Sequence, residues 1–371
     1  MSSGVRVWMV VEKNQLLVST VNISIPFVGL SSHGGIRILV QFANIAAKAG
    51  HKVSFYYPRG KSSHVYRIDE RVELVEVGPR IRNKFVGWVV FGCIFPFVNK
   101  GDLIVANHFV TYYPSVFARR KKKVVYLVQD IEFRFYPWLL SKIAYLICRG
   151  SYRSDQMFAA NKYLYEELKA FGSPRGCLDY GIDPIFIKQP LTSVPAAEKS
   201  FDVIYFLRRE FHKRRGRFEK ILPGLLEKGY KVVCVSQDQS LLDEFAQRFE
   251  VEVRKPANDL DLVACMDSAR VMVLTSDHEG FALPPLECMA RKIPVIVYDC
   301  GGPRDYAVHG ENALVLENDD SAPLLETIEL LLEDGALYAR LAENARKTAE
   351  RYDVELDLAR FLEEVTADID I

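Results

Sequence analysis

The stretch Glu279-Gly-Phe-Ala-Leu-Pro-Pro-Leu-Glu287 decides the fold of this chain. It follows the apolar run 271–276, which is typical of a buried strand in a parallel sheet. Gly280 permits close backbone approach, and the two prolines suit the first turn of a helix. The turn therefore points unpaired N–H groups and a positive dipole end at a ligand, which favours phosphate. Because carboxylates accept hydrogen bonds from hydroxyls, Glu279 and Glu287 predict a diphosphate between two polyols, such as a nucleotide-sugar.

Further motifs follow this turn in the order found in a known family. The spaced Glu pair resembles the signature of the retaining GT-B glycosyltransferases of family 4. Residues 290–297, Ala-Arg-Lys-Ile-Pro-Val-Ile-Val, look like that family's helix end and next strand. Residues 301–305, Gly-Gly-Pro-Arg-Asp, look like its Gly-Gly-x-x-Glu turn with Asp305 in place of Glu, and 310–315 look like its Gly-x-Asn-Gly-Leu strand start. The resemblance covers most of the chain, but it is sharp only in the C-terminal half.

Length and composition indicate an ordinary globular protein of two or three domains. The chain has 371 residues, 49% of them hydrophobic, and a mean hydropathy of zero. Its seven cysteines form no Cys-x-x-Cys pair, so we expect reduced thiols and a cytoplasmic location. A predicted strand at 5–11 starts almost at once, so we expect no signal peptide. The longest uncharged apolar run, 85–98, is too short to span a bilayer.

The two halves of the chain differ in charge, although the net charge is zero. Residues 1–184 hold 25 Lys and Arg against 13 Asp and Glu, whereas 185–371 hold 23 against 35. This asymmetry predicts an anionic partner for the first half, or two domains that attract each other across a cleft. We expect a membrane surface or a lipid phosphate and no nucleic acid, because no nucleic-acid-binding module is recognisable.

Three stretches of the first half favour peripheral contact with a membrane. They are the basic run 119–123, the aromatic stretch 133–138 and the apolar run 85–98, which could line a groove for a lipid acceptor. Core packing explains the aromatic and apolar stretches equally well, and a short basic run is usually a solvated loop. Both interpretations stay open from the sequence.

Strand and helix patterns alternate along the chain, which predicts βαβ units in parallel sheets. No Gly-x-Gly-x-x-Gly follows the first strand, which argues against a dinucleotide-dependent oxidoreductase. We expect the α/β GT-B arrangement of two doubly wound, Rossmann-like domains facing across a cleft: an acceptor domain at 1–185, a donor domain at 186–352, and a helix at 353–371 that the resemblance returns to the first domain. The expected strands lie at 5–11, 52–57, 72–77, 102–106, 123–128, 156–160, 202–207, 230–235, 251–253, 271–275 and 293–298, with a loop at 12–35 and helices at 36–49, 215–228, 239–248, 259–268, 284–291, 322–333 and 336–351.

Two groups resemble the family's diphosphate-binding elements. Arg208 ends the strand 202–207, and Lys213 follows five residues later, which looks like the Arg and Lys pair that neutralises the donor diphosphate. A solvated basic run is the alternative. Gly34 and Gly35 precede the first helix and resemble the glycine-rich loop, where a helix N-terminus offers N–H groups to phosphate.

Candidates on the acceptor side follow two strands of the first half. Gln129 and Asp130 stand where the family commonly has His-Asp. Gln129 cannot act as a base, but its amide can hydrogen-bond a sugar hydroxyl, and Asp130 is a candidate for positioning the acceptor. His108 follows the strand 102–106, so it either faces the cleft or serves as a structural hydrogen-bonding residue.

The remaining candidates concern the base and a metal. Arg254 lies where the family's base-recognition loop is found; a charge that faces water is the alternative. Asp259 and Asp261 spell an Asp-x-Asp, but they open a predicted helix, where Asp caps N–H groups, so we expect no metal.

The resemblance implies a retaining glycosyltransferase with a nucleotide-sugar donor, a glycan or lipid-linked acceptor and no cofactor. Glu279 would contact sugar hydroxyls and Glu287 the ribose. Two alternatives remain, a nucleotide-sugar epimerase of related fold and a non-catalytic GT-B-like partner protein. The diphosphate would be held by Arg208, Lys213 and the amides of Gly280, Phe281, Ala282 and Leu283.

Overall fold

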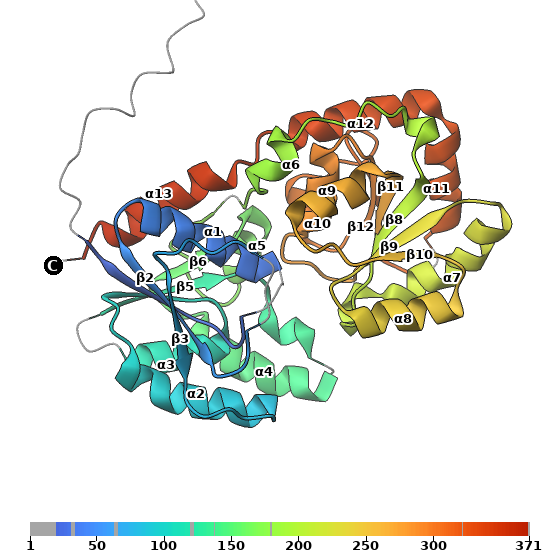
Figure 1. The fold of residues 1–371 in the computed structure, drawn as a ribbon. Helices are drawn as coiled ribbons and strands as arrows, with labels where there is room; N and C mark the ends of the chain where they lie inside the picture. Colours follow the sequence, from blue (N-terminus) through green and yellow to red (C-terminus); the bar gives the residue numbers. More distant parts are fainter. Residues whose placement is uncertain are drawn as a thin grey trace, which may run out of the picture.

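The computed structural model describes residues 20–30, 34–62, 66–118, 122–136, 138–178, 180–320 and 322–369. In this part of the chain, two parallel sheets lie side by side, each with helices on both faces (Figure 1). The predicted class, α/β with two doubly wound sheets, is therefore confirmed. The predicted strand at 5–11 lies outside the described residues.

The N-terminal sheet has the strand order β3-β2-β1-β4-β5-β6-β7, and its neighbouring strands run parallel. The chain order reverses between β1 and β4, and open α/β sheets bind ligands beyond the carboxyl ends of strands at such a point. The strands are β1 (Asn22–Pro26), β2 (Lys52–Pro58), β3 (Glu73–Val77), β4 (Leu103–Ala106), β5 (Lys123–Val128), β6 (Met157–Ala159) and β7 (Gly176–Cys177).

Helices cover both faces of this sheet. α2 contacts α3 and α3 contacts α4 on one face, whereas α1 lies on the other (Figure 1). Asn83 and His108 cap α2 and α3 by accepting N–H groups of the first turn. The helices are α1 (Gly34–Lys48), α2 (Lys84–Val98), α3 (Phe109–Phe117), η1 (Glu132–Phe135), α4 (Trp138–Ser151), α5 (Lys162–Leu168) and α6 (Pro184–Lys188).

The C-terminal sheet has the order β10-β9-β8-β11-β12-β13 and is also parallel. Its buried strands are almost wholly apolar, as expected for strands covered on both faces. Its elements are β8 (Phe201–Phe206), η3 (Phe211–Lys213), α7 (Arg215–Glu227), β9 (Val232–Val235), α8 (Gln239–Arg248), β10 (Glu252–Arg254), α9 (Asp259–Asp267), β11 (Ala269–Leu274), α10 (Leu283–Ala290), β12 (Val295–Tyr298), η4 (Gly302–Asp305), β13 (Leu314–Leu316), α11 (Leu324–Glu333) and α12 (Gly335–Ala349), preceded by η2 (Ala196–Glu198).

The assignment of residues 12–35 to a loop was wrong. Residues 22–26 form β1, which lies in the middle of the N-terminal sheet between β2 and β4. The segment alternates polar Asn22 and Ser24 with apolar Ile23 and Ile25, and it is short. The strands beside it come from distant parts of the sequence. Pairing with these strands, more than the local sequence pattern, therefore makes this segment a strand.

The chain crosses between the two sheets twice, at positions that touch each other. The first crossing leads into α6, and the second leads from α12 into α13 (Val354–Thr366). The Ile182 amide donates to the Tyr352 carbonyl at 3.2 Å, and Ile182 pairs with Asp353 as an isolated bridge. Beyond this point α13 packs along α1, with Phe361 against Phe42 (Figure 1).

No helix in the described residues is long and apolar enough to cross a membrane.

Candidate active site

A cleft between the two sheets encloses a cavity of about 940 Å³. Residues from both sides line it, and they include all the predicted site residues except Arg254. Cavities of this size are typical of small-molecule sites. We call the two sides the N-terminal wall and the C-terminal wall. The N-terminal wall holds Gly34, Gly35, Arg37, His108, Gln129, Asp130 and Glu132, and the C-terminal wall holds Arg208, Lys213, Glu279, Gly280, Phe281, Ala282, Leu283 and Glu287.

The turn from β11 into α10 shapes the C-terminal wall. Ala282 has φ 66°, a left-handed conformation that costs free energy in a non-glycine residue, and α10 begins at the next residue. Pro284 and Pro285 occupy the first turn, and no side chain of the described residues caps it. The remaining N–H groups and the helix dipole of α10 therefore face the cavity, as the sequence predicts.

Glu279 and Lys213 form an ion pair in this wall. Lys213 Nζ lies 2.8 Å from both carboxylate oxygens of Glu279, and Ser276 Oγ donates to Oε1 at 2.6 Å. Burial lowers the pKa of Lys213, but the Glu279 carboxylate more than offsets this, so the pKa is raised overall. Glu279 is 7% exposed. A charged pair with little water around it is thus available to a polar ligand at the cavity surface.

Glu287 is paired across the cleft with a residue that the sequence analysis did not identify. Arg37 of α1 donates to Glu287 Oε1 at 3.2 Å, and its Nη2 lies 2.9 Å from Asp259 Oδ1. Burial raises the pKa of Glu287 to about 7, while Arg37 opposes this shift. Asn258 caps α9, so the expectation that Asp259 does so was wrong. Asp259 instead pairs with Arg37.

Gln129 and two glycines bring the walls into contact. Gln129 Nε2 donates to the Gly35 carbonyl at 3.0 Å, so its amide supports the glycine loop. A Cβ at Gly35 would lie 2.1 Å from Gln129 Oε1, and a Cβ at Gly280 would lie 2.2 Å from the Gln129 carbonyl oxygen. Because Gly280 faces a backbone atom, it requires glycine in this closed arrangement, whereas a side chain at Gly35 would displace the end of the Gln129 side chain.

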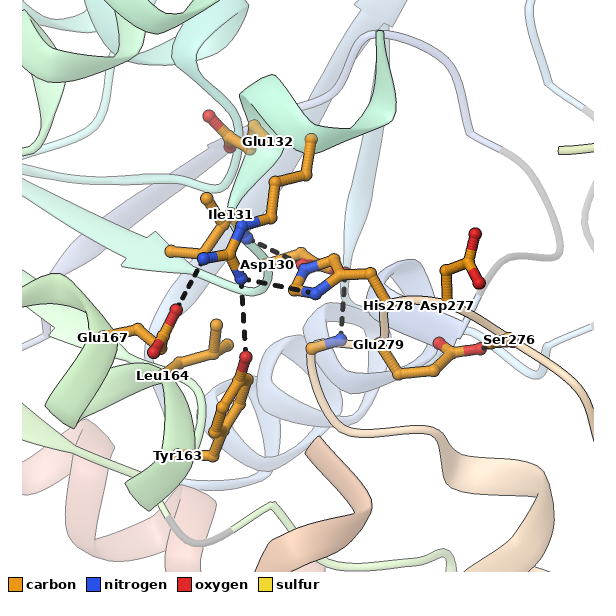
Figure 2. Close-up of polar contacts among 12 residues, drawn as sticks. Asp130, Ile131, Glu132, Tyr163, Leu164, Glu167, Ser276, Asp277, His278 and Glu279 are labelled. Atoms are coloured by element: carbon orange, nitrogen blue, oxygen red, sulfur yellow. Dashed lines mark hydrogen bonds and ion pairs between the residues drawn. The ribbon is translucent and has the colours of Figure 1, made fainter. Parts of the chain in front are cut away.

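Asp130 connects the walls through a second set of hydrogen bonds (Figure 2). Its carboxylate accepts from the Gly280 amide at 3.0 Å and lies 2.5 Å from His278 Nε2. Arg134 Nη1 lies 3.4 Å from His278 Nδ1, and because arginine only donates, Nδ1 accepts and Nε2 donates to Asp130. Burial raises the pKa of Asp130, but the interaction with His278, the charge of Lys213 and the hydrogen bond from the Ile131 amide together outweigh it, so the pKa is lowered.

His108 lines the cavity while it caps α3. Its Nδ1 accepts from the Val110 amide at 3.2 Å, which places the proton of the neutral ring on Nε2. Burial lowers the pKa of His108 to about 4, so the ring is neutral at physiological pH. His108 thus faces the cleft and also serves as a structural hydrogen-bonding residue, so both interpretations from the sequence describe its position.

Glu132 is a buried carboxyl in the N-terminal wall. Its Oε2 accepts hydrogen bonds from the Tyr126 hydroxyl at 2.7 Å and the Phe109 amide at 3.2 Å. Burial raises the pKa of Glu132 to about 8. The group therefore holds a proton over part of the physiological pH range.

Arg208 follows β8 and Arg254 ends β10, and only the first of them lines the cavity. Arg208 lines the cavity near Lys213, as predicted. The guanidinium of Arg254 stacks over Phe201 at 4.9 Å and lies 3.5 Å from Glu252, and Arg254 does not line the cavity. The expected contact of Arg254 with a base has no support in this position, because its side chain packs on the sheet.

Three residues at the walls were missed from the sequence. Arg37 could have been noticed in the sequence, because it is a charged residue directly between apolar residues of α1. Glu132 follows β5 closely, and His278 directly precedes Glu279. The roles of Arg37 and His278 depend on contacts across the cleft, and the role of Glu132 depends on its burial; the sequence pattern encodes neither.

Among the described residues, no group of three or more His, Cys, Asp or Glu side chains could hold a metal ion.

Asp305, which replaces the family's Glu, accepts from the Tyr163 amide at 3.1 Å. It lies in η4, beside a smaller cavity and away from the main cleft.

Part of the chain matches a known family. Residues 195–348 match the family model described as glycosyl transferases group 1. The chain is 33% identical over 102 residues to the N,N'-diacetylbacillosaminyl-diphospho-undecaprenol alpha-1,3-N-acetylgalactosaminyltransferase of Campylobacter jejuni, covering 28% of this chain and 27% of that protein. Matches cover 36% or less of the length of each curated relative compared.

Solved structures match almost the whole chain. Sucrose-phosphate synthase from Thermosynechococcus elongatus has a TM-score of 0.74 at 16% identity, covering 93% of this chain and 99% of that one. Anabaena HepE in complex with UDP-glucose has a TM-score of 0.70 at 18% identity, covering 94% and 100%. The chain thus has the GT-B fold, and its residues 195–348 match the model of the glycosyl transferases group 1 family.

Proposed function

We propose that this protein transfers a sugar from a nucleoside-diphosphate-sugar to a hydroxyl of a glycan or a lipid-linked glycan. One observation carries the proposal: Glu279, Glu287, Lys213 and the uncapped start of α10 line one cavity between two domains. Acidic groups for two polyols thus flank cations and N–H groups for a diphosphate.

The donor would lie along the C-terminal wall. Its diphosphate would meet the start of α10, Arg208 and Lys213, which stabilise the charge that builds on the leaving group. The sugar hydroxyls would donate to Glu279, and the ribose hydroxyls would donate to Glu287. Ribose binding would compete with Arg37 for the Glu287 carboxylate, because both need the same oxygens.

The reaction would keep the anomeric configuration. The bond between the anomeric carbon and the diphosphate oxygen breaks, and a bond to the acceptor oxygen forms on the same face. The acceptor proton passes to the departing diphosphate. No enzymic nucleophile is required, and the transfer is proposed to be independent of metal, which addition of a chelator would test by leaving the rate unchanged.

Names of similar proteins support the class of ligand and acceptor. HepE was solved with UDP-glucose, and the Campylobacter jejuni relative is named as a transferase acting on a diphospho-undecaprenol-linked sugar. A Staphylococcus aureus relative is named poly(ribitol-phosphate) alpha-N-acetylglucosaminyltransferase. We therefore place the proposed reaction in polysaccharide or glycolipid assembly.

A donor panel followed by a transfer assay tests the proposal. We expect one nucleoside-diphosphate-sugar to raise the midpoint of thermal unfolding and to release nucleoside diphosphate only when an acceptor glycan is present. Glu279→Ala should abolish transfer, and Glu343→Gln, an exposed change on α12, should not. Epimerised donor without acceptor, donor binding without transfer, or full activity of Glu279→Ala would each overturn it.

A further inference from the structure

Helix α2 lacks the polar side that helices on the outside of a domain normally have. Between Lys84, its first residue, and Val98, its last, no charged side chain occurs. Its inner side buries Phe91 and Phe95 in the core. Its outer side is also apolar, and Phe97 is 88% exposed. A helix that is apolar all round is normally buried all round, so water is an unsuitable medium for the outer side of α2.

The neighbouring helices extend this apolar surface. Figure 1 shows α2, α3 and α4 together on the side of the sheet opposite to α1 and α13. Phe117 at the end of α3 is 81% exposed, and Leu146 of α4 is 69% exposed. We name the exposed apolar side chains of these helices the outer-helix surface. It consists of Phe85, Val86, Val89, Phe97, Val98, Phe117, Ile143, Leu146 and Ile147.

Exposed apolar side chains are concentrated on this surface. Its members are nine of the 17 large apolar side chains that are exposed in the described residues. The others are scattered over both domains. Single exposed apolar residues need no explanation, but a contiguous apolar patch marks an interaction site.

The segment that carries α2, α3 and α4 holds charges of mainly one sign. Residues 80–153 hold 13 Lys and Arg and only 3 Asp and Glu. None of the three acids is exposed: Asp102 accepts from Asn22, Asp130 binds the Gly280 loop, and Glu132 is buried. In the described part of this segment the exposed cations are Arg80, Arg82, Lys84, Lys100, Lys142, Arg149 and Arg153.

This combination complements one kind of partner. Apolar side chains can enter the boundary between lipid headgroups and acyl chains, while the cations around them meet anionic phosphates. An apolar protein interface would not need a surround of one charge sign. At 15 residues α2 is about 22 Å long, too short to cross the roughly 30 Å hydrocarbon core, so the contact is with one leaflet.

The same helix also reaches the cleft. Lys84 and Trp88 line the cavity, and Trp88 Nε1 donates to the Val28 carbonyl at 3.0 Å. Phe85 and Val89, their immediate neighbours, are exposed on the outer side. Helix α2 is thus the rim between the outer-helix surface and the N-terminal wall.

We propose that the outer-helix surface docks this protein on an anionic lipid bilayer, with α2 at the level of the headgroups. Docking depends only on this surface and stands apart from the proposed function. Combined with that function, it gives a lipid-linked acceptor a path from the bilayer over the α2 rim to the N-terminal wall.

Two exposed cysteines supply a direct test in the full chain. Cys93 lies on the outer side of α2, and Cys177 lies on β7; the other cysteines are buried. An environment-sensitive dye on Cys93 of a Cys177→Ser variant should shift to the blue with vesicles of phosphatidylglycerol and phosphatidylcholine. The same dye on Cys177 of a Cys93→Ser variant should not shift.

Flotation of unlabelled variants measures the affinity. Phe85→Ser, Val89→Ser and Phe97→Ser together should lower the vesicle partition coefficient about tenfold or more. The matched control changes three exposed apolar residues elsewhere, Val308→Ser, Leu330→Ser and Leu356→Ser, and should leave partition unchanged. Lys142→Gln and Arg149→Gln should each lower it about fivefold at low salt.

Several results would overturn the proposal. Equal binding to neutral phosphatidylcholine vesicles would remove the role of the cations, and no binding to any vesicle would remove the docking itself. A Cys93 signal that depends on protein concentration without lipid, with a doubled particle mass, would make the surface an interface between two copies. Because none of these readouts uses sugar transfer, they are independent of the proposed function.

Discussion

The two walls of the cleft hold their polar groups in different ways. In the C-terminal wall, Glu279 and Lys213 pair with each other inside one domain, next to an uncapped helix start. In the N-terminal wall, Gln129 donates to the Gly35 carbonyl, and Asp130 accepts from the Gly280 amide of the opposite domain. The C-terminal wall is therefore preformed for a ligand, whereas in the N-terminal wall Asp130 lines the cavity but is held by the opposite domain.

The largest expected effect breaks the preformed wall. Lys213→Met removes the cation beside Glu279, and we expect kcat to fall about 100-fold to 1,000-fold, because the leaving diphosphate loses a preorganised charge. Steady-state kinetics with the donor found in the panel measure this. Lys213→Arg should recover part of the rate, and Lys228→Met, at an exposed lysine after α7, is the control. A rate within threefold of the original protein would show that this wall does not supply the charge.

An intermediate effect tests the contact between the walls. The Cβ of Gly280→Ala would meet the Gln129 carbonyl, so the walls could not close and kcat/KM should fall about 100-fold. Gly335→Ala, where an added Cβ meets nothing within 4 Å, is the matched control. Small-angle scattering should show a larger radius of gyration for the Gly280 variant only. Unchanged scattering and kinetics would mean that closure does not need this contact.

The third expected effect is on stability and not on activity, and it concerns the buried carboxyl of the N-terminal wall. The folded-state pKa of Glu132, about 8, exceeds the ordinary value, so the folded state keeps a proton that the unfolded state loses. The free energy of unfolding should therefore fall as pH rises from about 4.5 to about 8, by about 1.4 kcal/mol for each pH unit, and then level off.

Glu132→Gln isolates that effect because it preserves the acceptor for Tyr126 without a titratable proton. Thermal and urea unfolding at pH 5, 6.5 and 8 should show the variant gaining stability relative to the original chain as pH rises. Glu70→Gln, an exposed change, should show no such gain. A difference that is independent of pH would contradict the assignment.

The sequence predicted the C-terminal domain better than the N-terminal one for a physical reason. Helices α8 and α9 carry Asp238 and Asn258 as local caps, and α10 carries prolines in its first turn, so their ends were found to within a residue or two. β1 has no such local marker, and it was missed.

The candidate site divides in the same way. The Glu279 turn could be predicted because strand, bend and helix are consecutive in sequence. Arg37 and His278 could not, since each acts through a partner that only the packing of the two domains brings near. The partner of Glu132 is local, because Tyr126 lies six residues before it, but the sequence pattern does not show that both side chains are buried. Gln129 shows the same limit, because its neighbour Gly35 lies 94 residues away along the chain.

The two crossings of the chain between the domains limit how the molecule can open. Because Ile182 of the first passage is hydrogen-bonded to Tyr352 of the second, the two connections form a single pivot. A Cβ on Gly181 would lie 2.3 Å from the Val354 amide, so the two connections cross with no room for a larger residue. We expect the two domains to rotate about this single hinge with little twist. The same edge of the cleft would then widen first each time the domains open.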